Sequence, residues 1–254
     1  MSKAEVEKAT LTTDDPRDRG PWADPALVKL RNWDPVWAEQ CFKMSTNPWT
    51  NGILPKKTLE LIALALNMAA TNLNPGGTRR HVRSALAVGA TREEILTVLK
   101  ISTVMSIHSC SLGASILMEE ATMADLDILR SKPASTPACD SMKAAGQWSE
   151  AWNPFFNFAP MWTEELMATS IGVYQSGVLP AKEIELISIA LDASYSRMFA
   201  FGTRRHIKNA LKAGATVLEI MEVLKLCVAQ GVQGCNLAVP ILAEETGEAQ
   251  ATAI

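Results

Sequence analysis

The sequence predicts an all-α protein made of two similar helical repeats that pack together as a pseudo-dimer. The motif GTRRH occurs at 77–81 and again at 202–206, an offset of 125 residues (206 − 81), which indicates a site made twice. The helix-start pattern T-x-x-E recurs at the same offset, at 91–94 and 216–219. The alternation of apolar and polar residues typical of strands is absent from the sequence. Neither repeat alone would cover its apolar helices, so we expect the two to pack against each other.

The composition is typical of a soluble globular chain. Its 254 residues are 48% apolar, and 24 basic and 27 acidic residues give a net charge of −3. Such a mixture offers no basic surface for nucleic acid and no polybasic membrane anchor. The expected partners are therefore a small molecule and further copies of the chain. Residues 1–20 lack the apolar core of a secretory signal, so we expect a flexible arm and a cytoplasmic protein.

Five cysteines occur without any C-x-x-C motif or metal-binding Cys/His spacing. An odd number in this arrangement favours reduced thiols over disulfides or a zinc site, so we expect no metal. Two uncharged stretches, 101–118 and 226–243, are long enough to span a bilayer. Their serine, histidine, glutamine and asparagine residues instead favour helices buried in a core or a subunit interface.

The elements can be expected in order along each repeat. The repeat begins near residues 34–37 and 159–162, and Pro55 and Pro180 then start helices that run to about 68 and 193. A turn and a second helix follow, which Gly89 and its counterpart Gly214 end. The T-x-x-E motifs start a third, long helix in each repeat. We expect the following organisation: an arm at 1–20, the first repeat at 21–125, a linker at 126–145, the second repeat at 146–247 and a tail at 248–254.

The run HVRSALAVGATREEI at 81–95, with the E-L-I-x-x-A-L helix before it, resembles the carboxymuconolactone decarboxylase and AhpD-like alkylhydroperoxidase superfamily. The resemblance covers about residues 34–120 and 159–245. It implies two tandem AhpD-like helical repeats and obligate oligomers, such as a trimer of two-repeat chains. It also implies a small-molecule site between helices, with no metal or organic cofactor.

The AhpD-like branch of this superfamily places a C-x-x-C pair ahead of the histidine. The positions seven and four before His81 are Asn74 and Gly77, and the equivalent positions before His206 are Phe199 and Gly202. Because no thiolate stands there, we expect no peroxidase activity of the C-x-x-C type.

The decarboxylase branch acts on a lactone carboxylate without a cofactor. Arginine suits carboxylate binding and histidine suits proton transfer, and this chain has both residues twice. That branch has an acidic residue four before the histidine, where this chain has glycine, so its substrate is not carried over. We expect a cofactor-free lyase or isomerase acting on a small carboxylate or lactone. The candidate residues are His81 and His206 as general acid/base, Glu60 and Glu185 to orient them, Arg80 and Arg205 to bind the carboxylate, and Trp37 and Trp162 to line the pocket.

Two structural alternatives remain open for these residues. Successive residues on a helix are about 100° apart, so Arg80 can share a pocket with His81 while Arg79 faces elsewhere. Both arginines could instead bind acidic residues at an interface, with the histidines as core residues of a non-catalytic oligomer. Similarly, Glu60 and Glu185 could pair with a lysine of their own helix, Lys56 or Lys182.

A third alternative is a thiol peroxidase that uses cysteines outside a C-x-x-C motif. Cys110 and Cys235 occupy the same position in the two repeats, each in an uncharged helix where a thiol is most often a small buried apolar group. His108, two residues before Cys110, breaks the symmetry because its counterpart is Gln233. The sequence assigns no role to His108.

Overall fold

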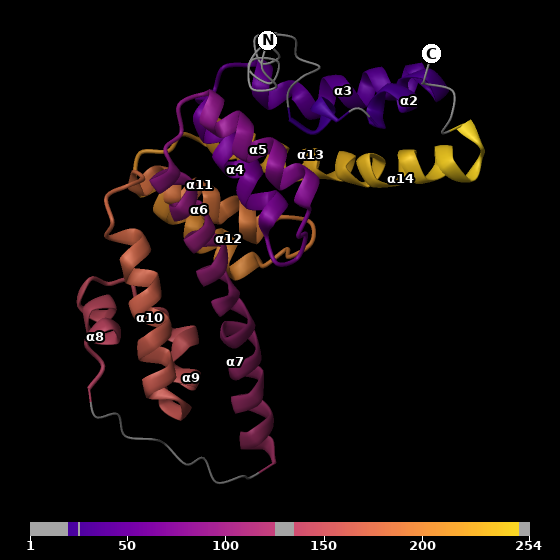
Figure 1. Cartoon of the computed structure of the whole chain (residues 1–254). Coiled ribbons are helices and arrows are strands. Elements are labelled where there is room, and N and C mark those ends of the chain that lie inside the picture. Colours follow the sequence, from indigo (N-terminus) through magenta and orange to yellow (C-terminus); the bar gives the residue numbers. More distant parts are fainter. Residues whose placement is uncertain (1–19, 25, 125–134, 249–254) are drawn as a thin grey trace, which may run out of the picture.

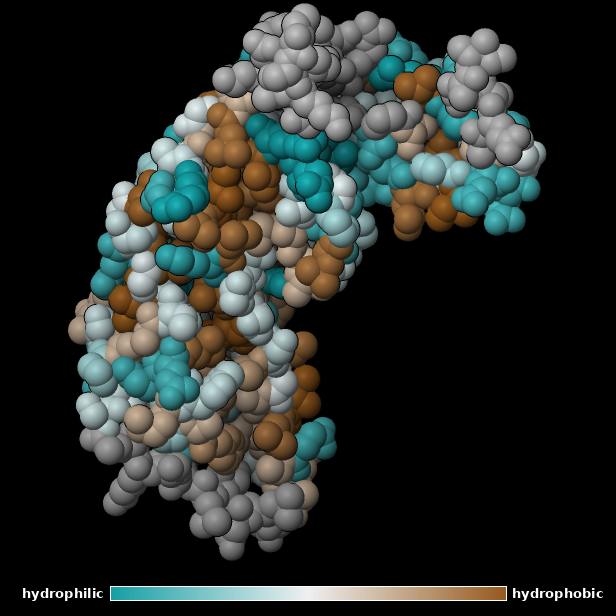
Figure 2. Space-filling view, viewed as in Figure 1, coloured by the Kyte–Doolittle hydropathy of each residue, from teal (hydrophilic) through white to brown (hydrophobic). Residues whose placement is uncertain are grey.

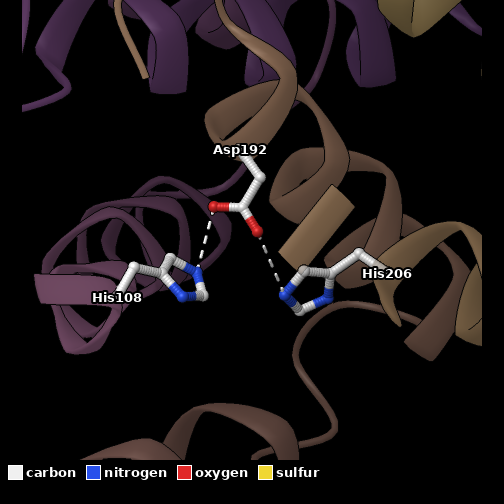
Figure 3. Close-up of side chains that lie close together, drawn as sticks. All are labelled: His108, Asp192 and His206. Atoms are coloured by element: carbon white, nitrogen blue, oxygen red, sulfur yellow. Dashed lines mark ion pairs between the residues drawn. The ribbon is translucent and has the colours of Figure 1, made fainter. Parts of the chain in front are cut away.

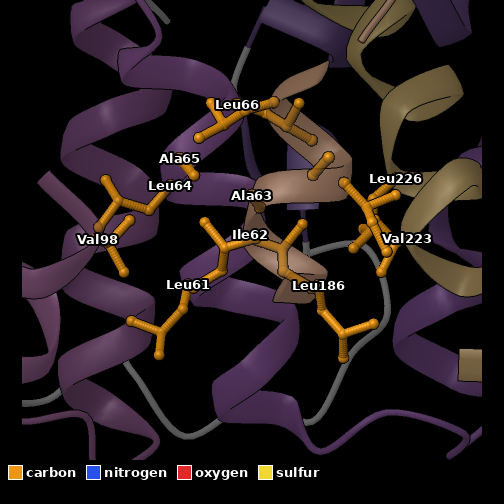
Figure 4. Close-up of a cluster of buried hydrophobic side chains, with 14 of the residues drawn as sticks. Leu61, Ile62, Ala63, Leu64, Ala65, Leu66, Val98, Leu186, Val223 and Leu226 are labelled. Atoms are coloured by element: carbon orange, nitrogen blue, oxygen red, sulfur yellow. The ribbon is translucent and has the colours of Figure 1, made fainter. Parts of the chain in front are cut away.

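Helices α4 (Lys56–Met68) and α11 (Ala181–Ala193) lie side by side at the centre of the computed structural model, which describes residues 20–24, 26–124 and 135–248 (Figure 1). Every residue of α4 from Thr58 to Asn67 is buried. Figure 4 shows α4 and α11 with side chains of α6 and α13 packed on either side. The all-α class is confirmed, because the described residues form helices and no strand.

A pseudo-twofold axis relates the repeats and passes between α4 and α11. Thr58 Oγ1 donates to Glu183 Oε1 at 3.0 Å, and these residues are repeat counterparts (183 − 58 = 125). Ser196 and Thr71, another counterpart pair, join their hydroxyls at 3.0 Å. A residue that contacts its own counterpart lies beside the symmetry axis. The predicted pseudo-dimer is thereby confirmed.

The remaining helices follow the same order in both repeats. Each repeat adds two helices after its central one, then a 3-10 turn and a last helix. In the first repeat these are α5 (Pro75–Ala87), α6 (Arg92–Val104), the turn at Met105–Ile107 and α7 (His108–Met123). In the second they are α12 (Ala200–Lys212), α13 (Val217–Ala229), the turn at Gln230–Val232 and α14 (Gln233–Glu245). The sequence predicted one long helix where the structure has two joined by a 3-10 turn.

The last helix of each repeat lies against the other repeat (Figure 1). Helix α7 packs against α9 (Asn153–Phe158) and the 3-10 turn at Glu150–Trp152, whereas α14 packs against α2 (Ala26–Trp33). Likewise α6 contacts α10 (Pro160–Tyr174), and α13 contacts α3 (Pro35–Thr50). The two repeats therefore exchange their C-terminal helices, and each site is built from both halves of the chain.

The predicted linker at 126–145 needs correction in its second half. Helix α8 (Pro137–Ala144) packs against α10, and Cys139 on it is fully buried. Glu164 of α10 accepts from the amide N–H groups of Ala138 and Cys139 at 2.6 and 2.9 Å, which anchors the start of α8. The predicted arm at 1–20, the first half of the linker and the tail at 248–254 lie almost wholly outside the described residues.

Two helical stretches, Arg92–Met123 and Val217–Glu245, are long and apolar enough to cross a membrane by length and composition alone. About half of each apolar window is buried inside the fold, 50% and 44%. Core helices of soluble proteins have the same character, so these stretches are weak evidence for a membrane span.

Candidate functional site

Each repeat joins its predicted histidine and glutamate in a short contact. His81 Nδ1 lies 2.7 Å from Glu60 Oε2, and His206 Nδ1 lies 2.6 Å from Glu185 Oε2. The glutamates stand on α4 and α11 and the histidines on the helices that follow, and all four side chains are buried. A buried carboxylate at Nδ1 holds that nitrogen protonated and directs Nε2 the other way.

The alternative pairing of the glutamates with lysines of their own helices finds no support in the second repeat. There Lys182 Nζ lies 2.8 Å from Glu219 Oε1, the capping glutamate of α13. In the first repeat, Lys57 makes the same contact with Glu94 at 2.6 Å. Lys57 and Lys182 thus hold the start of the third helix in place, and Glu185 contacts the imidazole of His206 instead of Lys182.

The glycine four residues before each histidine is required by a side chain from the preceding helix. A Cβ on Gly77 would collide with Asn67 Oδ1, and a Cβ on Gly202 would collide with Asp192 Oδ2. Asn67 and Asp192 are counterparts, near the ends of α4 and α11, and both are fully buried. The space opened by glycine is thus filled by an amide in the first repeat and by a carboxylate in the second.

The first-repeat site is closed by internal hydrogen bonds. Trp49 Nε1 donates to Glu60 Oε1 at 2.7 Å. Arg80 Nη1 lies 3.3 Å from Asp24 Oδ2, and its Nη2 donates to Gln233 Oε1 at 3.3 Å. Burial lowers the pKa of the Arg80 guanidinium, and the charge of Asp24 opposes that effect. Both ends of this guanidinium are therefore occupied by groups of the chain itself.

The second-repeat site has different partners at the same positions. Tyr174 replaces Trp49, and burial together with the charge of Glu185 raises the pKa of Tyr174 to about 12. Arg205 donates from Nη2 to the Gln147 carbonyl at 3.0 Å and lies over the Trp152 ring, 4.7 Å from its centroid. No carboxylate pairs with Arg205 among the described residues. Its charge therefore remains available to an anionic ligand.

Asp192 lies between two imidazoles (Figure 3). His108 Nε2 is 3.0 Å from Asp192 Oδ1, and His206 Nε2 is 3.8 Å from Oδ2. Arg197 Nη1 also lies 3.7 Å from Oδ1. His108 is the first residue of α7, so the first repeat contributes it to the site of the second.

A small cavity of about 30 Å³ adjoins this cluster, which is room for about one water molecule. Its polar lining comprises His108, Ser170, Tyr174, Arg205 and His206. Arg205 also borders an outer groove of about 660 Å³. The charged residues of that groove are Arg204, Arg205, Lys208, Lys212 and one acid, Glu185. Its positive charge suits an anionic ligand.

The structure places the predicted arginines as helix geometry requires. Arg205 lines the cavity together with His206, whereas Arg204 faces only the outer groove. In the first repeat Arg79 lines a separate surface groove with Arg83 and Thr78.

Trp37 and Trp162 do not line the pocket as the sequence predicted. They lie in the first turns of α3 and α10, 46% and 48% exposed, and Trp162 packs edge-on against Phe155. Trp49 and Tyr174, near the opposite ends of those helices, are instead the counterpart aromatic residues beside Glu60 and Glu185. Sequence reasoning missed this pair, because the repeats carry different residue types at that position.

Four further site residues gave only partial sequence signals. Asn67 and Asp192 are polar residues within otherwise apolar helices, which is itself a signal that they meet a partner. His108 and Gln233 stand out only as a break in the repeat symmetry. Their positions depend on the exchange of α7 and α14, which no local pattern reveals.

The surroundings of the cysteines do not favour the thiol-peroxidase alternative. Burial raises the pKa of Cys227 to about 12 and also raises that of Cys235. Cys110 is half-buried and packs against an apolar cluster that includes Ile107, Met142 and Phe155. A reactive thiol needs an environment that favours the thiolate, whereas the burial of Cys227 and Cys235 favours the neutral thiol.

One group of described residues could hold a metal ion by its geometry. The ligand atoms of His108, Asp192 and His206 all lie within 4.8 Å of one another. Two histidines and a carboxylate form a known ligand set for divalent metals.

The chain is similar to a known protein family and to a solved structure. Residues 35–107 and 160–243 match the carboxymuconolactone decarboxylase family. The fold is similar to the crystal structure of a protein from Burkholderia xenovorans LB400 that is provisionally named a gamma-carboxymuconolactone decarboxylase subunit. The two chains are 31% identical, with a TM-score of 0.83 over 92% of this chain and 95% of that chain. No curated protein matches this chain.

Proposed function

Because the chain belongs to the carboxymuconolactone decarboxylase family, we propose that it is a cofactor-free lyase or isomerase of a small carboxylate or lactone. His81 and His206 serve as general acid/base, and Glu60 and Glu185 orient them. In the second repeat, Arg205 binds the substrate carboxylate. Arg80 has the same role in the first repeat once a substrate displaces its contacts with Asp24 and Gln233.

One observation carries this proposal: a buried glutamate contacts Nδ1 of each histidine at 2.6 to 2.7 Å. The contact keeps the proton on Nδ1, so Nε2 presents a lone pair that can take up or return a proton. The carboxylate also stabilises the imidazolium that forms when Nε2 accepts the proton.

The proposed chemistry needs no reactant other than the substrate and a proton from water. In a decarboxylation, the carboxylate leaves as CO₂ and its bonding electron pair stays on the ring carbon, which then takes a proton from an imidazolium. Water returns a proton to the imidazole and completes the cycle. In an isomerisation, an imidazole removes a proton from one carbon and the same proton is returned at another. A cationic side chain that binds the reacting acid limits its motion in either reaction.

Arg205 and the outer groove support an acidic substrate in the second repeat. The groove brings four cationic side chains beside one acid. A lactone is larger than the 30 Å³ inner cavity, so its binding requires the contact between Arg205 and the Gln147 carbonyl to open. Arg205 would then turn from a backbone carbonyl to the substrate carboxylate, where the hydrogen bond is charge-assisted on both sides.

We also propose that the chain acts as a homo-oligomer. Leu112, Ile116 and Leu117 on α7 are each at least 47% exposed, and so are their counterparts Leu237, Ile241 and Leu242 on α14. Figure 2 shows apolar surface along both exchanged helices. Apolar patches of this kind on a folded chain are typical of protein interfaces.

The activity can be tested by changing both histidines to alanine. Purified wild type and the His81→Ala/His206→Ala variant are incubated with gamma-carboxymuconolactone and with a panel of small lactone acids in D₂O. CO₂ release reports a lyase, and deuterium incorporation without CO₂ reports an isomerase. We expect the variant to lose turnover by roughly 100-fold or more while keeping the wild-type helical spectrum and size.

Unchanged turnover in that folded variant would overturn the assignment of the histidines. A matched Thr103→Ala variant removes an exposed side chain of α6 and should turn over at the wild-type rate. If it loses activity equally, the loss in the histidine variant has a general structural cause.

A further inference from the structure

The second-repeat site contains a buried charge that the proposed mechanism does not use. Asp192 is fully buried, and neither of its carboxylate oxygens accepts a hydrogen bond from the described residues. Both ring nitrogens of His108 are likewise buried without a hydrogen bond from that part of the chain. A carboxylate out of water needs a positive partner close by. The candidates within 4 Å are His108, His206 and Arg197.

The first repeat shows what this position looks like without a charge. Asn67 replaces Asp192, and Gln233 replaces His108. Gln233 Oε1 accepts from Asn74 at 3.0 Å and from Arg80 at 3.3 Å, which ties it into the closed first site. The fold therefore accepts two amides here. The carboxylate and imidazole of the second repeat are not needed to hold the helices together.

From this contrast we propose, resting on the function proposed above, that His108 is a second acid/base residue of the second-repeat site and that Asp192 couples it to His206. His108 and His206 line the same cavity, beside Arg205. Asp192 reaches both imidazoles, one from each oxygen (Figure 3). The carboxylate stabilises a proton on either ring. Arg197 Nη1 lies 3.7 Å from Oδ1, the oxygen that also faces His108.

Two acid/base groups in one cavity suit a particular class of reaction. A shift of a double bond along a small unsaturated acid requires removal of a proton at one carbon and delivery at another. One imidazole accepts the first proton, and the other, as imidazolium, donates the second. The proton then passes between the rings by way of Asp192, so the pair returns to its starting state without an outside acid or base. The first-repeat site, with one imidazole and two amides, lacks this second group.

The same three residues could instead bind a divalent metal, and the surrounding charges disfavour that alternative. Glu185 and Asp192 carry two negative charges, and Arg197 and Arg205 carry two positive ones, so the site is neutral with uncharged imidazoles. A divalent ion would leave an excess of two positive charges in a buried site, whereas one shared proton leaves an excess of one.

Ring-nitrogen NMR tests the coupling without any substrate. The chain has only three histidines, so ¹⁵N-labelled protein gives three resolvable imidazoles: His81, His108 and His206. We expect Asp192→Asn to change the ¹⁵N chemical shifts of the ring nitrogens of both His108 and His206. Those of His81 should not change. If either His108 or His206 keeps its wild-type signals, Asp192 does not couple the pair.

A second variant covers the possibility that Asp192→Asn does not fold. His108→Gln introduces the residue that the first repeat already carries at this position. This variant should change the ¹⁵N chemical shifts of the His206 ring nitrogens. Unchanged His206 signals would overturn the coupling. Zinc added to EDTA-treated wild-type protein completes the test. Retention of one Zn²⁺ per chain after desalting, with shifts at His108 and His206, would identify a metal site and overturn the proposal.

Turnover then tests the catalytic role of His108. With gamma-carboxymuconolactone or any lactone acid on which the wild type proves active, His108→Gln should lower kcat at least tenfold with little change in KM. A wild-type kcat would remove His108 as an acid/base residue even if the coupling is observed. Absence of turnover in the wild type itself would count against the proposed function and would leave the NMR result standing.

Discussion

Each repeat has a glycine four positions before its histidine because a side chain of the preceding helix fills the space beside it. The side chain of Asn67 or Asp192 occupies the volume that a Cβ at Gly77 or Gly202 would need. Glycine is therefore required here by close approach of a neighbouring helix and not by backbone conformation. The related branches place a thiol or a carboxylate on this residue, whereas here the polar group comes from the helix before it.

We predict that Gly77→Ala destabilises the protein by about 1–3 kcal/mol, the usual cost of overpacking a well-packed site. Urea denaturation followed by circular dichroism measures this cost. Gly113→Ala on α7 is the matched control, because nothing lies within 4 Å of a Cβ there, and it should be neutral or stabilise by about 0.5–1 kcal/mol. Adding Asn67→Ala should restore part of the stability lost in Gly77→Ala. Without such a restoration, Asn67 is not the side chain that demands glycine.

Some residues of the site could be predicted from the sequence, and others could not. The repeat and helix periodicity identified His81, Glu60 and Arg80, and the structure brings these residues together at one site. Trp37 and Trp162 were selected because both repeats carry tryptophan there, yet the identity of a residue in two repeats does not report which way it faces. His108 and Asp192 meet only through packing of α7 on the opposite repeat, and a single sequence does not contain that information.

At the scale of elements, the start of the third helix is the part that the sequence predicts best. Thr91 and Thr216 accept from the N3 amides at 3.1 Å, and Glu94 and Glu219 accept from the cap amides at 2.7 Å. A capping box depends on four consecutive residues, so it can be predicted without knowledge of the tertiary fold. The break at Met105–Ile107 was missed because the apolar pattern continues through it.

We predict that Thr91→Ala or Thr216→Ala costs about 1 kcal/mol of stability through loss of the cap.

Burial alone would raise the pKa of Glu94, but hydrogen bonds from Lys57 and the Thr91 backbone bring it below its ordinary value. The same opposing effects lower the pKa of Glu219, with Lys182 as its partner. A lowered folded-state pKa gives stability that is full above the unfolded value and is lost as pH falls through the folded value. Stability should therefore decline below about pH 4.5, the ordinary value for glutamate.

Denaturation midpoints measured at neutral and acidic pH test this dependence. The Glu94→Gln/Glu219→Gln variant should lose less stability on acidification than the wild type does. If both proteins lose the same amount, other carboxylates control the acid response.

At the scale of the whole molecule, the exchange of α7 and α14 makes the two halves of the chain interdependent. Each site takes a polar side chain from the opposite repeat, His108 in one case and Gln233 in the other. The repeats have diverged at these positions, so a symmetric scaffold carries one closed site and one site with a cavity. The sequence predicted the pseudo-dimer because five matching residues at one offset are a long-range signal. It did not predict the exchange, since the order of elements along the chain is the same with or without it.

The exposed apolar faces of α7 and α14 lead to a prediction about assembly. We expect sedimentation analysis of the wild type to show an oligomer, and Leu112→Glu/Leu237→Glu to weaken it, because charges in an apolar interface are costly. A matched Thr122→Glu variant places a charge on an exposed side chain near the end of α7 and should leave the oligomer intact. A wild type that sediments as a monomer would contradict the proposed assembly.

The most direct test of acid/base chemistry by the carboxylate–imidazole pairs is the turnover of a variant in which both glutamates become glutamine. Glu60→Gln/Glu185→Gln keeps side-chain volume but removes the charges that fix and stabilise the imidazoles at 2.7 and 2.6 Å. We expect turnover of gamma-carboxymuconolactone, or of the lactone acid on which the wild type is most active, to fall by roughly 100-fold while the fold is retained. A folded variant that turns over at the wild-type rate would show that the carboxylate–imidazole pairs serve the core and not the chemistry.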